Sequence, residues 1–144
     1  LFIARPTLIY GLNDPHNGYG PNRFLRQALN NEKISIFGKG EELRDHVSID
    51  DVGRIISEAV CHKSSGILNI ASGKTISFRA IAEKIVFLTN PSIEITETPR
   101  AGEMPHNGFR PFDIKSTTDY FPNFEYMDIS EGLRKLVHDK LYSN

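Results

Sequence analysis

The sequence predicts a mixed fold of the α/β or α+β class, built as one structural unit. Short β-rich runs intermix along the chain with segments whose apolar residues recur every three or four positions. The chain of 144 residues is 39% hydrophobic and 24% charged, which is typical of a globular protein and argues against disorder. No internal repeat, linker or low-complexity tract divides the sequence.

The first part of the chain contains two predicted strands and one helix. Residues 7–10 are β-rich and end at Gly11, and a loop rich in glycine, proline and asparagine follows over residues 11–21. Pro21 suits the first turn of a helix, and its apolar face is Phe24, Leu25, Ala28 and Leu29. Residues 34–37 form a short strand, closed by Gly38-Lys39-Gly40.

The clearest helix lies in the middle of the chain. Ser48-Ile49-Asp50-Asp51 has the spacing of a capping box, with Asp in place of the usual Glu. The apolar residues behind it form one helical stripe, which consists of Val52, Ile55, Ile56, Ala59 and Val60.

The second half continues the alternation. We predict a strand over 66–71, a helix capped by Ser77 that stops at Asn90-Pro91, and a half-buried strand over 93–98. Residues 99–112 lack periodicity and form a long loop, and Asp128 with Glu131 begins a last helix. The buried faces of the two helices are predicted to be Phe78, Ile81, Ala82, Ile85 and Leu88, and then Leu133, Leu136, Val137 and Leu141.

Composition excludes several classes of function. Lys and Arg number 17 against 18 Asp and Glu, so a general nucleic-acid or anionic-membrane binder is not expected. No apolar run approaches the length of a membrane span. The single Cys61 rules out an internal disulfide and fits a reducing compartment, so we expect a cytoplasmic protein. The chain opens inside the apolar run Leu1-Phe2-Ile3-Ala4 without an initiator Met, which suggests a part of something longer; a processed N-terminus is the alternative.

Metal and hydrolytic sites find no support in the motifs. The five histidines have no ligand spacing, so surface or loop positions are expected for them, and no metal site is predicted. Cys61 is expected to be a half-buried, inert thiol. Gly38-x-Gly40 lacks the third glycine of a dinucleotide fingerprint, and a tight turn explains it more simply.

Two arginines are candidates for binding an anion. Arg44 precedes the capped helix, and Arg100 follows the predicted strand over 93–98. Guanidinium groups at the mouth of an α/β sheet suit bidentate contact with phosphate. The alternative for each is a salt bridge, and Arg44 has an adjacent partner in Asp45.

Together these segments resemble the C-terminal part of the NAD-dependent sugar epimerase/dehydratase family, the extended short-chain dehydrogenases/reductases. The resemblance covers nearly the whole chain, and it rests on five motifs in order. They are Arg5-Pro-Thr-Leu-Ile-Tyr10-Gly11, Ile34-Ser-Ile-Phe37-Gly38-x-Gly40, Arg44-Asp45-His-Val-Ser-Ile-Asp50-Asp51-Val52, Gly66-Ile-Leu-Asn69-Ile70-Ala-Ser72-Gly73 and Arg100-Ala-Gly102-Glu103. The family often has Phe or Tyr where this chain has His46.

The resemblance implies an α/β fold, with residues 1–11 a late strand of a Rossmann parallel sheet and residues 12–144 mostly the smaller lobe that binds a nucleotide diphosphosugar. It implies that Arg44 and Arg100 contact the diphosphate from opposite sides. Asn22 and Phe24 would approach the nucleotide, Ile36 and Phe37 would bed its base and ribose, and Tyr10 and Gly11 would lie near the sugar and nicotinamide. Asp50 and Asp51 would be structural.

The cofactor implied is NAD or NADP, held mainly by a part of the parent protein outside these residues. The glycine fingerprint of that family and its Tyr-x-x-x-Lys pair do not occur here, so no catalytic residue is assigned and the chain alone is expected to be inactive. The parent would be an isomerase, a lyase or another oxidoreductase that passes hydride from a sugar carbon to NAD through a keto intermediate. A homodimer, a non-catalytic nucleotide-sugar-binding module and a reductase of non-nucleotide substrates remain open.

Overall fold

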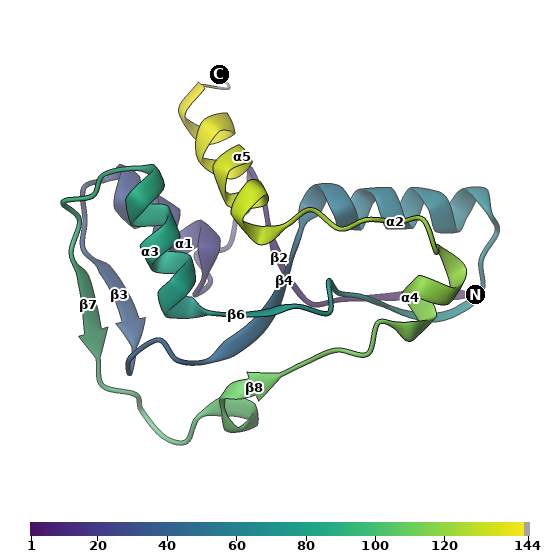
Figure 1. The fold of residues 1–144 in the computed structure, drawn as a ribbon, viewed down its shortest axis with the longest axis horizontal. Helices are drawn as coiled ribbons and strands as arrows, with labels where there is room; N and C mark the ends of the chain where they lie inside the picture. The colour runs from purple at the N-terminus through teal and green to yellow at the C-terminus, as the bar shows by residue number, and fades with distance from the viewer. Residues whose placement is uncertain (143–144) are drawn as a thin grey trace.

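The computed structural model describes residues 1–142, which form an elongated α/β assembly (Figure 1). The helices are α1 (Pro21–Leu29), α2 (Ile49–Cys61), α3 (Phe78–Leu88), α4 (Lys115–Tyr120), α5 (Ile129–Tyr142) and the 3-10 helix η1 (Pro105–Gly108). The strands are β1 (Phe2–Pro6), β2 (Leu8–Tyr10), β3 (Ile34–Phe37), β4 (Leu43–Ser48), β5 (Gly66–Ile70), β6 (Thr75–Ser77), β7 (Ile95–Thr98) and β8 (Phe109–Arg110). The predicted α/β class is therefore confirmed.

Within residues 1–142 the strands form three small sheets, in which parallel pairing predominates. β1 pairs with β5, β3 pairs with β7, and β2 pairs with β4, all in parallel. β4 also pairs with β8 in parallel and with β6 in antiparallel orientation. The first strand-forming segment changes partner at Thr7, whose N–H donates to the Ile70 carbonyl and whose Oγ1 donates to the Asp45 carbonyl.

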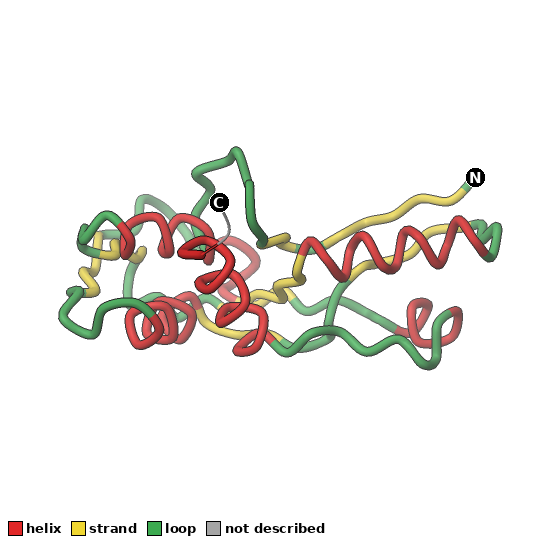
Figure 2. The backbone as a smooth tube through the Cα atoms, turned by 90° about the horizontal axis from the view of Figure 1, so that it is seen from above, coloured by secondary structure: helices red, strands yellow, loops and turns green. Residues whose placement is uncertain are grey.

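In the part of the chain that the structure describes, buried apolar residues form two separate clusters. At one end, α1 and α3 lie beside β3 and β7, and their shared cluster includes Phe24, Ile36, Phe78, Ile81 and Leu133 (Figure 1). At the other end, α2 runs alongside the N-terminal strand, and its cluster includes Val47, Ile55, Leu68, Ile70 and Phe121 (Figure 2). β4 runs between the two ends, which places its side chains at the centre of the molecule.

The helix starts follow the capping predictions. The Ser48 Oγ accepts a hydrogen bond from the Asp51 N–H at 3.0 Å, and the Ser77 Oγ accepts one from the Ala80 N–H at 3.1 Å. Asp128 accepts from the Ser130 N–H at 2.9 Å at the start of α5. Each cap satisfies an N–H that has no partner inside its helix, which fixes where the helix begins.

The predicted helix faces are mostly confirmed, with three errors. Ile56 and Val60 on α2 and Leu141 on α5 are exposed, although they continue the apolar stripes. Each of these helices meets its neighbours over a narrower face than its apolar residues cover. Exposed apolar side chains also occur on the first strands, at Ile3, Leu8 and Ile9.

Several elements lie outside the predictions. The sequence did not predict β4, β6, α4, η1 or β8. Of these, η1 and β8 interrupt the loop expected over 99–112, and α4 follows shortly after it. The turn over Gly38-Lys39-Gly40 is confirmed, because the Gly40 N–H donates to the Phe37 carbonyl at 3.0 Å. Cys61 is exposed, so its predicted half-burial is wrong. No helix within residues 1–142 is long and apolar enough to cross a membrane.

Candidate functional site

β4 brings three polar residues in succession into the centre of the molecule. Arg44, Asp45 and His46 are all buried, although each could carry a charge. Burial of a polar or charged group lowers the stability of the fold unless the group finds hydrogen-bond or ionic partners. The contacts of these three side chains therefore show which groups are held in place and which are free to meet a ligand.

Arg44 is held by backbone oxygens rather than by its sequence neighbour. Its guanidinium donates to the Leu43 carbonyl and to the Pro105 carbonyl, each at 2.9 Å. Arg44 does form the salt bridge that was the alternative to phosphate binding, but its partner is Glu42, at 3.5 Å, and not the adjacent Asp45. Two of the five guanidinium donors are thus used by carbonyls, which leaves others for a ligand.

Arg100 converges on the same carboxylate as Arg44. The Glu42 Oε1 accepts from Arg100 at 2.8 Å, and Arg100 also donates to the Phe37 carbonyl at 3.4 Å. Arg100 follows β7 and Glu42 directly precedes β4, so residues far apart in the sequence meet here. The two arginines predicted from the sequence therefore lie together, bridged by a carboxylate that sequence reasoning missed.

A cavity of about 520 Å³ adjoins Arg44. Its lining includes two further arginines, Arg5 on β1 and Arg110 on β8, together with Asp113. Arg110 is the direct register partner of Arg44 across the β4–β8 pair, and its guanidinium lies 5.3 Å from the centroid of the Phe112 ring. Neither Arg5 nor Arg110 was proposed from the sequence, since only strand pairing places them beside Arg44. The chemistry of this cavity suits an anion.

Asp45 joins β4 to the turn after β5. Its carboxylate accepts from the Ser72 N–H at 3.0 Å, the Ser72 hydroxyl at 2.9 Å and the Gly73 N–H at 2.7 Å. Burial raises the pKa of Asp45, and these three hydrogen bonds oppose the rise. Asp45 is thus a structural anchor directly beside Arg44.

His46 is buried, contrary to the expectation for the scattered histidines. Its Nδ1 lies 3.2 Å from the Arg44 carbonyl, and its Nε2 has no hydrogen-bond partner among the described residues. Its ring packs edge-on against Phe78, with 5.6 Å between centroids. Burial, aided by the charge of Arg44, lowers the pKa of His46 to about 4.

This burial predicts a loss of stability in mild acid. The unfolded chain takes up the His46 proton near pH 6.5 and the folded chain only near pH 4, so the free energy of unfolding falls as pH drops through that window. We expect a loss of about 2 kcal/mol between pH 7 and pH 5, measured by urea unfolding. In His46→Phe this contribution should disappear, while His62→Gln, at an exposed site, should behave like wild type. An unchanged pH dependence in His46→Phe would contradict the assignment.

An exposed aromatic surface lies next to the arginine pair. Phe37 is 41% exposed, and its ring centroid is 4.8 Å from that of Tyr19. The Tyr19 hydroxyl accepts from the Phe37 N–H at 2.9 Å, which fixes the two rings together. Phe24, which was expected to approach the nucleotide, and Ile36, which was expected to bed its base and ribose, are both fully buried in the core. The Phe24 ring packs edge-on against that of Tyr19. Tyr19 was not proposed from the sequence.

Asn22 holds the end of β2 in place. Its amide oxygen accepts from the Gly11 N–H at 3.2 Å, and its amide nitrogen donates to the Gly11 carbonyl at 3.1 Å. A Cβ on Gly11 would lie 2.3 Å from the Ile49 side chain, so only glycine fits at this crossing with α2. Tyr10 is buried, with its hydroxyl against Gly132 of α5, and burial raises its pKa. The Tyr10 hydroxyl therefore stays protonated in the physiological range.

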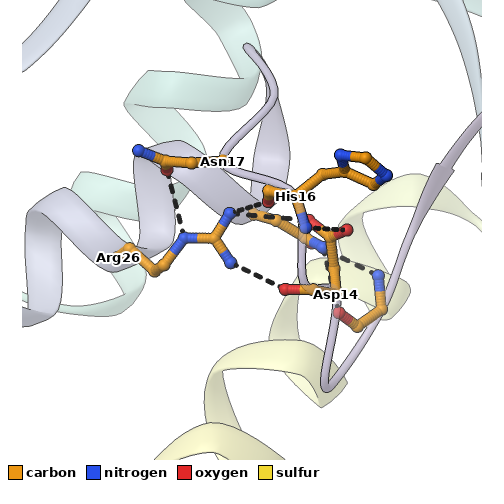
Figure 3. Close-up of polar contacts among 6 residues, drawn as sticks. Asp14, His16, Asn17 and Arg26 are labelled. Carbon is orange, nitrogen blue, oxygen red and sulfur yellow. Dashed lines mark hydrogen bonds and ion pairs between the residues drawn. The ribbon is translucent and has the colours of Figure 1, made fainter.

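Arg26 orders the loop that follows Gly11. Its guanidinium contacts the Asp14 carbonyl at 3.2 Å, the Asn17 side chain at 3.2 Å and the His16 carbonyl, as Figure 3 shows. The loop lines a second cavity of about 520 Å³, together with Tyr10, Gly11 and His46. α1 thereby fixes a wall of this cavity.

Comparison with known proteins gives a consistent result. Residues 1–71 match the model of the NAD dependent epimerase/dehydratase family. The chain is 28% identical over 147 residues to a UDP-N-acetyl-alpha-D-glucosaminuronate decarboxylase of Bacillus cytotoxicus, in a match that covers 94% of this chain. The chain spans 44% of the length of that curated relative.

Solved structures share the fold. The UDP-glucose 4-epimerase of Thermotoga maritima, determined with UDP-glucose, superposes with a TM-score of 0.80 at 24% identity over 95% of this chain and 44% of its own. The UDP-glucuronic acid 4-epimerase of Bacillus cereus, determined with UDP-glucuronic acid and NAD, superposes with a TM-score of 0.79 at 21% identity. That match covers 98% of this chain and 46% of the epimerase.

Proposed function

Because the chain belongs to the NAD-dependent epimerase/dehydratase family, we propose that it is the substrate-binding part of an enzyme that acts on a nucleotide diphosphosugar. The observation that carries this proposal is the meeting of Arg44 and Arg100 at one carboxylate, beside the exposed ring of Phe37. Relatives of this fold are solved with UDP-sugars, which agrees with an anionic ligand of this class.

The arginine pair suits a diphosphate. Two guanidiniums and one carboxylate leave a net positive charge in a largely buried setting, where charge-assisted hydrogen bonds are strong. The chain as a whole has a formal net charge of only −1. Affinity for an anion must therefore come from these placed groups and not from a general basic surface.

The aromatic surface suits the nucleoside. Phe37 offers a ring on which a base can stack, Tyr19 packs against it, and the buried Phe24 packs against Tyr19 from the core. Ile36 is fully buried, so we assign to it no direct contact with the ligand. We assign to Asn22 an indirect role, because both ends of its amide hold Gly11. The backbone of Tyr10 and Gly11 would border the sugar and the nicotinamide, at the cavity beside the loop that Arg26 holds.

NAD would supply the hydride acceptor for the sugar carbon and return the hydride where the reaction requires it. The residues of this chain would border at most one edge of that cofactor, at the cavity lined by Tyr10 and Gly11, because no G-x-x-G-x-x-G turn occurs in the sequence. We therefore propose that other residues of the parent protein hold most of this NAD or NADP.

This part of the protein would bind and orient the substrate rather than move its protons. The buried Tyr10 hydroxyl keeps its proton, and no Tyr-x-x-x-Lys pair occurs in the sequence. Residues 1–144 alone would thus be inactive, and the parent would be an epimerase (an isomerase) or a dehydratase (a lyase). The exposed thiol of Cys61 suits a reducing cytoplasm.

A ligand screen on the complete protein tests this proposal. In the presence of NAD, we expect one of the UDP-, dTDP-, GDP- or CDP-sugars to raise the melting temperature by several degrees, since a ligand at about 100 times its Kd adds about 2.7 kcal/mol. The matching free sugars should produce no shift. Failure of every nucleotide diphosphosugar would overturn the proposal.

A further inference from the structure

We propose that Glu42 is a positioning residue, which holds Arg100 in the orientation that the diphosphate requires. This inference rests on the proposed function, because it assigns a role within the same site. It concerns a buried carboxylate that no sequence motif marked, on the turn between Gly40 and β4.

Arg100 depends on Glu42 for its placement. The 2.8 Å contact with Glu42 Oε1 is the short one, while the Phe37 carbonyl lies at 3.4 Å, near the limit of a hydrogen bond. The Glu42 side chain is 7% exposed and that of Arg100 is 18% exposed. A charge pair this sheltered is screened little by salt, so it can fix a flexible side chain.

Arg44 does not share this dependence. Two carbonyls hold its guanidinium at 2.9 Å, and Glu42 lies further away at 3.5 Å. Loss of the Glu42 carboxylate should therefore release Arg100 toward solvent and leave Arg44 in place. Because only Arg100 should move, the effect of losing Glu42 can be distinguished from a general loosening of the site, which would displace both arginines.

The backbone of Glu42 is itself fixed. Its carbonyl accepts from the N–H of Phe78, the first residue of α3, at 3.2 Å. The next residue, Leu43, pairs with Ser77 on one side and Phe109 on the other. The carboxylate thus projects from a backbone tied to both neighbouring strands and to α3.

Affinity for a nucleoside diphosphate, compared with its monophosphate, tests the proposal. The probe is whichever of UDP, dTDP, GDP and CDP binds the complete wild-type protein most tightly. We expect Glu42→Ala to weaken the diphosphate roughly tenfold or more, as Arg100→Ala does, and to leave the monophosphate nearly unchanged. The double variant Glu42→Ala/Arg100→Ala should lose no more affinity than one of these substitutions alone, whereas Glu42→Ala/Arg44→Ala should lose clearly more affinity than either of its single substitutions.

Two further variants keep the result interpretable. Glu42→Gln retains a neutral acceptor, so its affinity for the diphosphate should fall only about threefold. This variant replaces Glu42→Ala if Glu42→Ala does not fold. Glu94→Gln is the matched control, because Glu94 is exposed and its ionic contact is with Lys33.

The outcomes separate this proposal from the proposed function. An unchanged diphosphate affinity in Glu42→Ala, or in Glu42→Gln where only that variant folds, would overturn the positioning role. Tighter binding would also overturn it, because Glu42 would then be a competitor of the ligand. Failure of the wild-type protein to bind any of the four diphosphates would instead overturn the proposed function.

Discussion

Replacing Arg44 with alanine is expected to weaken the binding of the nucleotide diphosphosugar by about 2 to 4 kcal/mol, or roughly 30-fold to 1,000-fold in Kd. The reason is that a buried guanidinium, held at 2.9 Å by two carbonyls, offers its remaining donors in a fixed direction. A loss of this size is typical of a charge-assisted, desolvated contact. Calorimetric titration of the complete protein in the presence of NAD measures it.

Two comparisons give this result its meaning. Arg44→Lys keeps the charge but not the planar fork, so it should recover only part of the affinity. The melting temperature of each variant shows how much of the loss is structural, because Arg44 also holds Leu43 and Pro105. A reductase of the same superfamily that acts on a non-nucleotide substrate would need no diphosphate contact. An unchanged substrate KM in Arg44→Ala would therefore favour that alternative over the proposed function.

Replacing Asp45 with alanine is expected to lower the free energy of unfolding by about 3 to 5 kcal/mol. Asp45 is 1% exposed, and its removal leaves the Ser72 N–H, the Ser72 hydroxyl and the Gly73 N–H without their acceptor. The turn after β5 would then lose its connection to β4. Urea unfolding followed by circular dichroism measures the change, provided that the m value stays constant.

Neighbouring positions provide the controls for Asp45. Ser72→Ala removes the hydroxyl contacts with Asp45 and with the backbone of Lys74 but keeps both N–H donors to the Asp45 carboxylate, so it should lower the free energy of unfolding by less than Asp45→Ala does. Asp50→Ala removes a half-exposed carboxylate whose ionic contact is with Lys135, and it should cost less than about 1 kcal/mol. If Asp45→Ala costs no more than Asp50→Ala, Asp45 is not the anchor that the geometry indicates.

Local signals in the sequence predicted the regular elements well. Ser48 and Ser77 cap α2 and α3 because an N-cap needs only a side-chain oxygen at the right position, which is a local property. Apolar periodicity found the helices, but it could not show how wide a face each one buries. Val60 continues the stripe of α2 and is nevertheless 69% exposed.

β4 escaped prediction for a physical reason. Its central residues Arg44, Asp45 and His46 are polar, and strand patterns are recognised by alternating or continuous apolar residues. The strand exists because both of its edges are paired and because the side chains of Arg44 and Asp45 find partners elsewhere in the chain. Those partners are tertiary, so no local rule reveals them.

In the candidate site, too, some residues could be predicted from the sequence and others only from tertiary contacts. The resemblance to a known family singled out Arg44 and Arg100, and the structure brings them to a common carboxylate. Glu42, Tyr19 and Arg110 could not be selected from the sequence, because their roles depend on a turn, a ring contact and a strand register that form only in the fold. The salt-bridge alternative named Asp45 as the partner of Arg44, but adjacent residues on a strand point to opposite faces, and Glu42 takes that place.

The central claim is that Arg44 and Arg100 together hold the diphosphate of a nucleotide sugar. A crystal structure of the complete protein with NAD and its nucleotide diphosphosugar tests it most directly. We predict that both guanidiniums lie within about 3 Å of diphosphate oxygens, with the base against Phe37. A diphosphate bound elsewhere, with Arg44 and Arg100 contacting only Glu42 and backbone carbonyls, would contradict the claim.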